Sequence, residues 1–156
     1  MKKLLTILAM VVAMAANSQV YVSGSFSYFN GPGTFEENGM ATVEVGKSFG
    51  NIFFLGVAGG VTSFKGGNKY LEFRPSAVLY TYKRLSVIGS LGAGYVWDTP
   101  QKILTEYCGT ISYALNSAWA LNFCGGGYSF NGKESSSKYT FVGTGLTLTI
   151  GSNDSQ

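Results

Sequence analysis

The chain has 156 residues, of which 12% are charged and 15% aromatic, and it contains 22 glycines and no histidine. The charged fraction is about half of the ~25% typical of soluble domains, and a net charge of +3 without a basic stripe excludes a nucleic-acid partner. Intrinsic disorder is excluded as well, because it goes with few aromatic residues and high charge.

The first predicted element is a cleavable secretory signal peptide over residues 1–18. A short basic region opens the chain, and an apolar run follows from Leu4 to Met14. Small residues then precede the expected cut after Ser18, with a cut after Ala15 as the alternative. The apolar run is too short for a membrane-spanning helix, which needs ~20 apolar residues. One mature domain is expected from the remaining length.

Eight segments of the mature chain alternate between apolar and more polar residues with a period of two, which is the pattern of a β-strand. In the fifth segment, for example, Leu85, Val87 and Leu91 share one face, and Ser86 and Ser90 share the other. The predicted strands are Val20–Phe29, Ala41–Phe49, Ile52–Ser63, Tyr70–Tyr82, Leu85–Trp97, Ile103–Leu115, Ala118–Phe130 and Lys138–Ile150.

The connections between these strands alternate between long and short. In order they are 30–38, 50–51, 64–68, 83–84, 98–102, 116–117 and 131–137. Barrels of the bacterial outer membrane alternate in this way, with short periplasmic turns and longer external loops. The predicted fold is therefore all-β: an eight-stranded antiparallel up-and-down transmembrane β-barrel over residues 19–150, with a short C-terminal tail at 151–156. Both mature termini are expected in the periplasm.

The more polar strand faces carry Ser, Thr, Gly, Ala and Tyr but almost no lysine, unlike the water-exposed face of a soluble sheet. We therefore assign them to the lumen, and strict alternation assigns Tyr80 to the lumen too. Because a buried charge must be paired, we expect Arg74 to contact Glu106 where glycines leave room. The predicted lumenal ion-pair network consists of Glu44, Glu72, Arg74 and Glu106.

Aromatic residues gather near the ends of the predicted strands. Such positions suit the girdles that flank the apolar band of a membrane barrel at both interfaces. The predicted aromatic girdle consists of Tyr28, Phe49, Tyr95, Trp97, Tyr113 and Trp119.

The two cysteines, Cys108 and Cys124, fall on the lumenal faces of two consecutive strands. Pairing about Asn116 makes them direct cross-strand neighbours, with Cα atoms ~4.5–5.5 Å apart, which suits a disulfide. Export makes oxidation possible. We therefore predict a disulfide between them, whereas a register displaced by two residues would leave two unlinked thiols.

This pattern over Val20–Ile150 resembles the small eight-stranded outer-membrane barrels, the family of the transmembrane domain of outer membrane protein A and its small adhesion-type relatives. The last strand supports the resemblance, since Gly145 is followed by alternating hydrophobic residues up to Ile150. In that family a similar strand, ending in an aromatic residue, addresses the chain to the barrel-assembly machinery. The resemblance implies that this machinery and outer-membrane lipid are partners.

No catalytic, cofactor-binding or metal-binding residues are predicted. The absence of histidine removes the usual general base and the commonest metal ligand, and eight strands leave a lumen too narrow for a diffusion pore. We expect a monomeric, non-enzymatic outer-membrane protein with a structural or adhesive role and an unidentified surface partner. The alternatives are a barrel enzyme acting on lipid and a secreted, soluble, lipocalin-like barrel. The candidate loop contacts are Phe35, Glu36, Glu37, Lys133 and Glu134.

Overall fold

The computed structural model describes residues 18–30, 38–50, 52–62, 67–97, 102–132 and 136–151. It contains the eight predicted strands, with ends that differ from the predicted ones by no more than two residues. They are β1 (Ser18–Asn30), β2 (Gly39–Phe49), β3 (Phe53–Thr62), β4 (Lys69–Tyr82), β5 (Leu85–Val96), β6 (Ile103–Ala114), β7 (Trp119–Asn131) and β8 (Ser136–Ile150).

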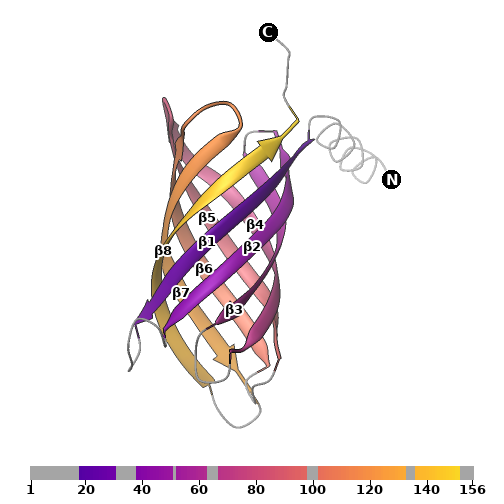
Figure 1. The fold of residues 1–156 in the computed structure, drawn as a ribbon, viewed down its shortest axis with the longest axis vertical. Coiled ribbons are helices and arrows are strands. Elements are labelled where there is room, and N and C mark those ends of the chain that lie inside the picture. Colours follow the sequence, from indigo (N-terminus) through magenta and orange to yellow (C-terminus); the bar gives the residue numbers. More distant parts are fainter. Residues whose placement is uncertain are drawn as a thin grey trace, which may run out of the picture.

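The strands form one closed antiparallel barrel in chain order, because each strand pairs with the next and β8 pairs back onto β1 (Figure 1). Closure leaves no strand edge without a hydrogen-bonding partner. We call the end of the barrel where β1 begins and β8 ends the turn end. The short connections β2–β3, β4–β5 and β6–β7 also lie there, and the opposite end is called the loop end. Among the described residues, no helix is both long enough and apolar enough to cross a membrane.

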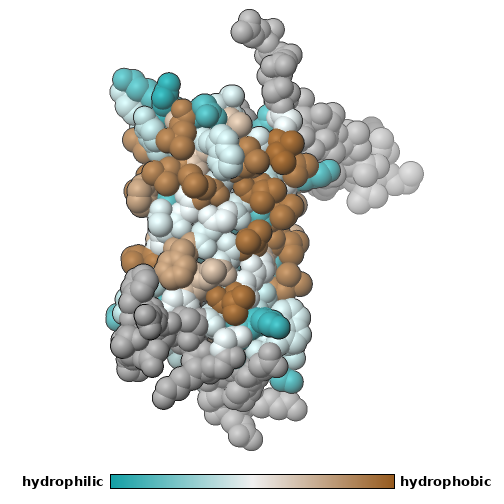
Figure 2. Space-filling view, in the orientation of Figure 1, coloured by the Kyte–Doolittle hydropathy of each residue, from teal (hydrophilic) through white to brown (hydrophobic). Residues whose placement is uncertain are grey.

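The outer wall of the barrel is largely apolar, and the four charged side chains of the Glu44, Glu72, Arg74 and Glu106 set face inward. Leu79, Leu91 and Val142 are 70%, 65% and 66% exposed, whereas the carboxylate residue Glu72 is only 1% exposed. Figure 2 shows apolar side chains over the wall, with many of the hydrophilic ones toward the two ends. This arrangement is the reverse of a soluble barrel and is the one that lipid requires.

One residue departs from the predicted alternation. Val78 pairs with Ile88, but Tyr80 pairs with Val87, so β4 holds one extra residue, Leu79, in a β-bulge. The bulge turns Tyr80 outward, where it is 63% exposed. The predicted lumenal position of Tyr80 was therefore wrong, because a one-residue insertion reverses the face of every residue that follows.

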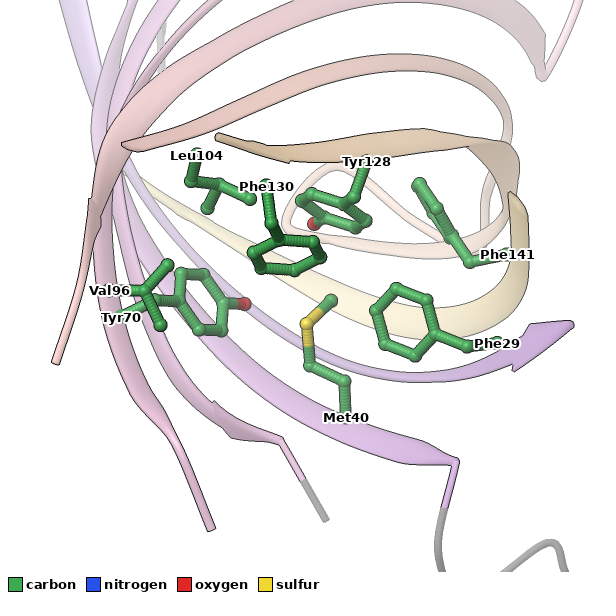
Figure 3. Close-up of a cluster of buried hydrophobic side chains, with 8 residues drawn as sticks. All are labelled: Phe29, Met40, Tyr70, Val96, Leu104, Tyr128, Phe130 and Phe141. Carbon is green, nitrogen blue, oxygen red and sulfur yellow. The ribbon is translucent and has the colours of Figure 1, made fainter. Parts of the chain in front are cut away.

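The loop end of the lumen is filled by apolar side chains from seven of the eight strands (Figure 3). At its centre the ring of Tyr128 lies 4.8 Å from that of Phe141 and 5.5 Å from that of Phe29, measured between centroids. This cluster, which we call the apolar plug, was not predicted from the sequence. Its members are Phe29, Met40, Tyr70, Val96, Leu104, Tyr128, Phe130 and Phe141.

Candidate functional site

The remainder of the lumen is a polar cavity of about 430 Å³, which we call the lumenal cup. It extends from Gly50 and Thr149 at the turn end to Tyr128 and Phe141 of the apolar plug. Serine and threonine are the commonest residues in its wall, and their side chains are too short to fill an eight-stranded barrel. The lumen thus has two parts, a plug of buried apolar side chains and a cup of the size of a small-molecule pocket.

At the inner end of the cup, Arg74 is surrounded by the three predicted carboxylates. Its Nη1 lies 2.9 Å from Glu44 Oε2, and its Nη2 lies 2.7 Å from Glu106 Oε2. Nη2 also forms an ion pair with Glu72. The structure thus brings together all four residues of the predicted network, including the expected Arg74–Glu106 contact. We call this group the Arg74 cluster.

Glycines on the neighbouring strands provide the space for the Arg74 cluster. A Cβ atom at Gly92 would lie 2.7 Å from Glu72 Oε2 and 3.0 Å from Glu106 Oε2. A Cβ atom at Gly94 would lie 2.6 Å from the Cβ of Glu72. These two glycines of β5 therefore allow side chains from β4 and β6 to meet across a strand that separates them.

Hydrogen bonds tie the Arg74 cluster to the surrounding wall and to the plug. The hydroxyl of Tyr21 donates to Glu44 Oε1 at 2.5 Å, and Arg74 Nη2 donates to the hydroxyl of Tyr128 at 3.3 Å. Three buried polar atoms in the described structure have no hydrogen-bond partner: Glu72 Oε2, Arg74 Nε and Glu106 Oε2, of which the last is ion-paired with Arg74 Nη2. With three carboxylates against one guanidinium, the cluster carries more negative than positive groups.

The predicted opposition of the two cysteines was wrong. Cys108 faces Gly126, and Cys124 faces Thr110, so the register is displaced by two residues from the predicted one and both thiols are free. The turn explains the displacement, because the side-chain Oδ1 of Asn116 accepts hydrogen bonds from the amides of Ala118 and Trp119 at 2.9 and 2.8 Å. This Asx-type turn lengthens the connection and centres it on the residue after Asn116.

The residues of the predicted girdle lie on the outer wall near the two ends. At the loop end, Tyr95 and Trp97 pack edge to face with ring centroids 5.4 Å apart. Three further aromatic residues at the turn end were not predicted as members, Phe53, Tyr80 and Tyr82, which are 50%, 63% and 57% exposed. The predicted residues are Tyr28, Tyr95 and Trp97 toward the loop end and Phe49, Tyr113 and Trp119 toward the turn end.

The candidate loop contacts Phe35, Glu36, Glu37, Lys133 and Glu134 lie outside the described residues, as do the predicted signal peptide up to residue 17 and the tail from residue 152. Within the described ranges, no group of three or more His, Cys, Asp or Glu side chains is placed to hold a metal ion. The described lumen therefore offers an ion-paired cluster, a polar cavity and two thiols.

Small β-barrels of known structure are similar to this chain. A de novo designed transmembrane β-barrel superimposes with a TM-score of 0.65 at 16% identity, over 85% of this chain and 95% of the design. The N-terminal β-barrel domain of OprF from Pseudomonas aeruginosa gives 0.65 at 11% identity, over 86% and 98%. The outer membrane protein Ail of Yersinia pestis gives 0.52 at 11% identity, over 85% and 100%. No protein-family model matches the sequence, and no curated protein matches it.

These similarities, together with the apolar outer wall, define the class of protein: the chain has the fold of the small eight-stranded transmembrane β-barrels. Within that class it is similar to outer-membrane barrels, at identities that establish the fold and no more.

Proposed function

We propose that this chain is a non-enzymatic protein of the bacterial outer membrane, with a structural or adhesive role that its external loops carry out. The observation that supports the proposal most directly is the inverted barrel, whose wall suits lipid and whose lumen is closed by the apolar plug. A closed lumen gives a solute no path through the barrel. The proposed function therefore depends on the outer wall of the barrel and on the loops at its ends.

The orientation follows from the connections. In outer-membrane barrels the short turns face the periplasm and the longer loops face outward. The turn end, with the start of β1 and the end of β8, would accordingly lie in the periplasm. The predicted contact residues Phe35, Glu36 and Glu37 between β1 and β2, and Lys133 and Glu134 between β7 and β8, would then be outside the cell.

The proposed partners are lipid and an unidentified surface molecule. The exposed apolar wall requires lipid around it, and assembly by the barrel-assembly machinery is proposed from the resemblance of the last strand. A closed barrel buries all its strand edges and can function as a monomer.

Deletion of the coding sequence, screened for envelope integrity and for adhesion, tests the role. Replacement of residues 31–37 and of residues 132–135 by short Gly-Ser segments should abolish surface binding while the protein still reaches the membrane in its folded form. A replacement of the turn residues 83–84 is the matched control, because it alters the opposite end. Unchanged adhesion in both loop variants and in the deletion strain, with an intact envelope, would reject the proposed role.

Two measurements separate the alternatives. Mass spectrometry of lipid A from the deletion strain should show an unaltered acyl pattern, and an altered pattern would favour a lipid-modifying enzyme. The mature protein should require detergent or lipid to remain dispersed, whereas a monomer stable in plain buffer would favour a soluble ligand-binding barrel.

A further inference from the structure

Cys108 and Cys124 lie on neighbouring strands but do not face each other directly. Because each cysteine faces a different residue on the partner strand, the two are diagonal neighbours across the β6–β7 pair. Diagonal neighbours have Cα atoms roughly 7–8 Å apart, beyond the 4.4–6.8 Å that a disulfide usually spans. Both side chains nevertheless point into the lumen from diagonal positions, and both line the lumenal cup. Their position opposes a covalent bond between the sulfurs but leaves them close.

Both thiols are accessible from the turn end. Cys108 and Cys124 are half-buried and line the lumenal cup, on the side of the strands that faces away from lipid. The sulfur of Cys108 lies 3.6 Å from the hydroxyl oxygen of Thr110, which lines the same cavity. Gly126, opposite Cys108, adds no side chain that would separate the two sulfurs. A small solute in the cup can therefore reach both of them.

Acidic side chains lie next to the thiols. Glu106 precedes Cys108 by two residues on the same face of β6, and it belongs to the Arg74 cluster, which contains three carboxyl groups and one guanidinium. Acidic side chains therefore outnumber basic ones at the inner end of the cup.

The available ligands select a particular kind of cation. Since the described residues hold no group of three or more His, Cys, Asp or Glu side chains placed for a metal ion, the tetrahedral set that Zn²⁺ prefers is missing. Two sulfurs alone suit soft cations that accept two ligands. We propose that Cys108 and Cys124 form a binding site for a two-coordinate thiophilic cation of the class Cu⁺, Ag⁺ and Hg²⁺, which enters the lumenal cup from the turn end.

The binding step involves no change of oxidation state. Each Sγ–H bond breaks, its proton passes to water in the cup, and a metal–sulfur bond forms in its place. One cation therefore releases two protons and consumes both thiols.

Titration of the reduced, refolded barrel in detergent with Hg²⁺, and separately with Ag⁺, tests the site. We expect one cation per barrel and complete loss of reactivity toward a thiol-alkylating reagent at that ratio. Cys108→Ser and Cys124→Ser should each weaken binding by at least ~100-fold, because the second sulfur binds the same ion intramolecularly. Reduced folding of either variant is detected by the shift in gel mobility that distinguishes folded from unfolded barrels.

A variant with two misplaced thiols is the control. Cys124→Ser combined with Ser112→Cys keeps two lumenal thiols but places them four residues apart on β6, roughly 14 Å at 3.4 Å per residue. It should bind as weakly as the single-thiol variants. Binding of two Hg²⁺ ions to the native barrel, equal affinity in this control, or a native protein without alkylatable thiols would each overturn the proposal.

Discussion

Glu106 of β6 and Gly92 of β5 are cross-strand partners. The Glu106 carboxylate occupies the space that a side chain at position 92 would need. Gly92→Ala should therefore destabilise the barrel by about 1–3 kcal/mol, as overpacking does elsewhere. Denaturant-induced unfolding in lipid vesicles, followed by tryptophan fluorescence, measures the change.

Gly24→Ala is the matched control for this substitution. Gly24 lies on the outer wall, and a Cβ there would meet nothing within 4 Å. Alanine should be neutral or stabilising at that position, since glycine in a strand costs roughly 0.5–1 kcal/mol. Equal effects of the two substitutions would contradict the close approach at Gly92.

Removal of the guanidinium should be the most damaging single change in the lumen. Arg74→Met leaves three carboxylates buried together without a counter-charge, and loss of one partner of a buried ion pair costs about 3–5 kcal/mol. Addition of Glu72→Gln and Glu106→Gln should restore much of the stability, because it removes the unpaired charges. The same unfolding experiment measures both, and an Arg74→Met barrel as stable as the native one would exclude a structural role for the cluster.

The position of the membrane can be tested with two substitutions on one face of β5. Leu91 lies in the middle of the strand and Leu85 at its turn end, and both side chains point outward. Leu91→Arg should cost about 2–4 kcal/mol in a bilayer, whereas Leu85→Arg near the interface should cost about 0–1 kcal/mol. Equal costs for both, measured by unfolding from vesicles, would argue against a bilayer around the barrel.

The bulge in β4 predicts where a fluorophore at position 80 will lie. In a background with Trp97→Phe and Trp119→Phe, Tyr80→Trp should be quenched by brominated lipids, because residue 80 points outward. Thr81→Trp is the control, since Thr81 lines the lumenal cup and a residue there should be shielded from lipid. Quenching at 81 rather than at 80 would restore the strict alternation that the sequence suggested.

The strands were predictable from the sequence because successive side chains of a membrane barrel face the lumen and the lipid in turn. This alternation gives the polarity of the residues a period of two along each strand. The Arg74 cluster was predictable for a related reason, since few charges fall on the inner face and each needs a partner. The pairing register of β6 and β7 was not predictable from the sequence, because it depends on the hydrogen bonds that the side chain of Asn116 accepts in a longer turn.

The apolar plug was missed although its signal is present in the sequence. Residues such as Phe29, Leu104 and Phe130 fall on the lumenal face, but only near the loop ends of their strands. Averaging the composition of a whole face hides such a gradient along the strand. The bulge at Leu79 falls within the apolar run Ala77 to Tyr80, in which alternation of polarity cannot assign the faces.

The apolar plug also decides which side of the membrane the interior of the barrel communicates with. Water and small ions reach the Arg74 cluster through the cup, while the packed rings of Phe29, Tyr128 and Phe141 close the other direction. The ionic surroundings of the buried carboxylates therefore follow the solution at the turn end. In the proposed orientation, the lumenal cup is continuous with the periplasm and is separated from the solution outside the cell.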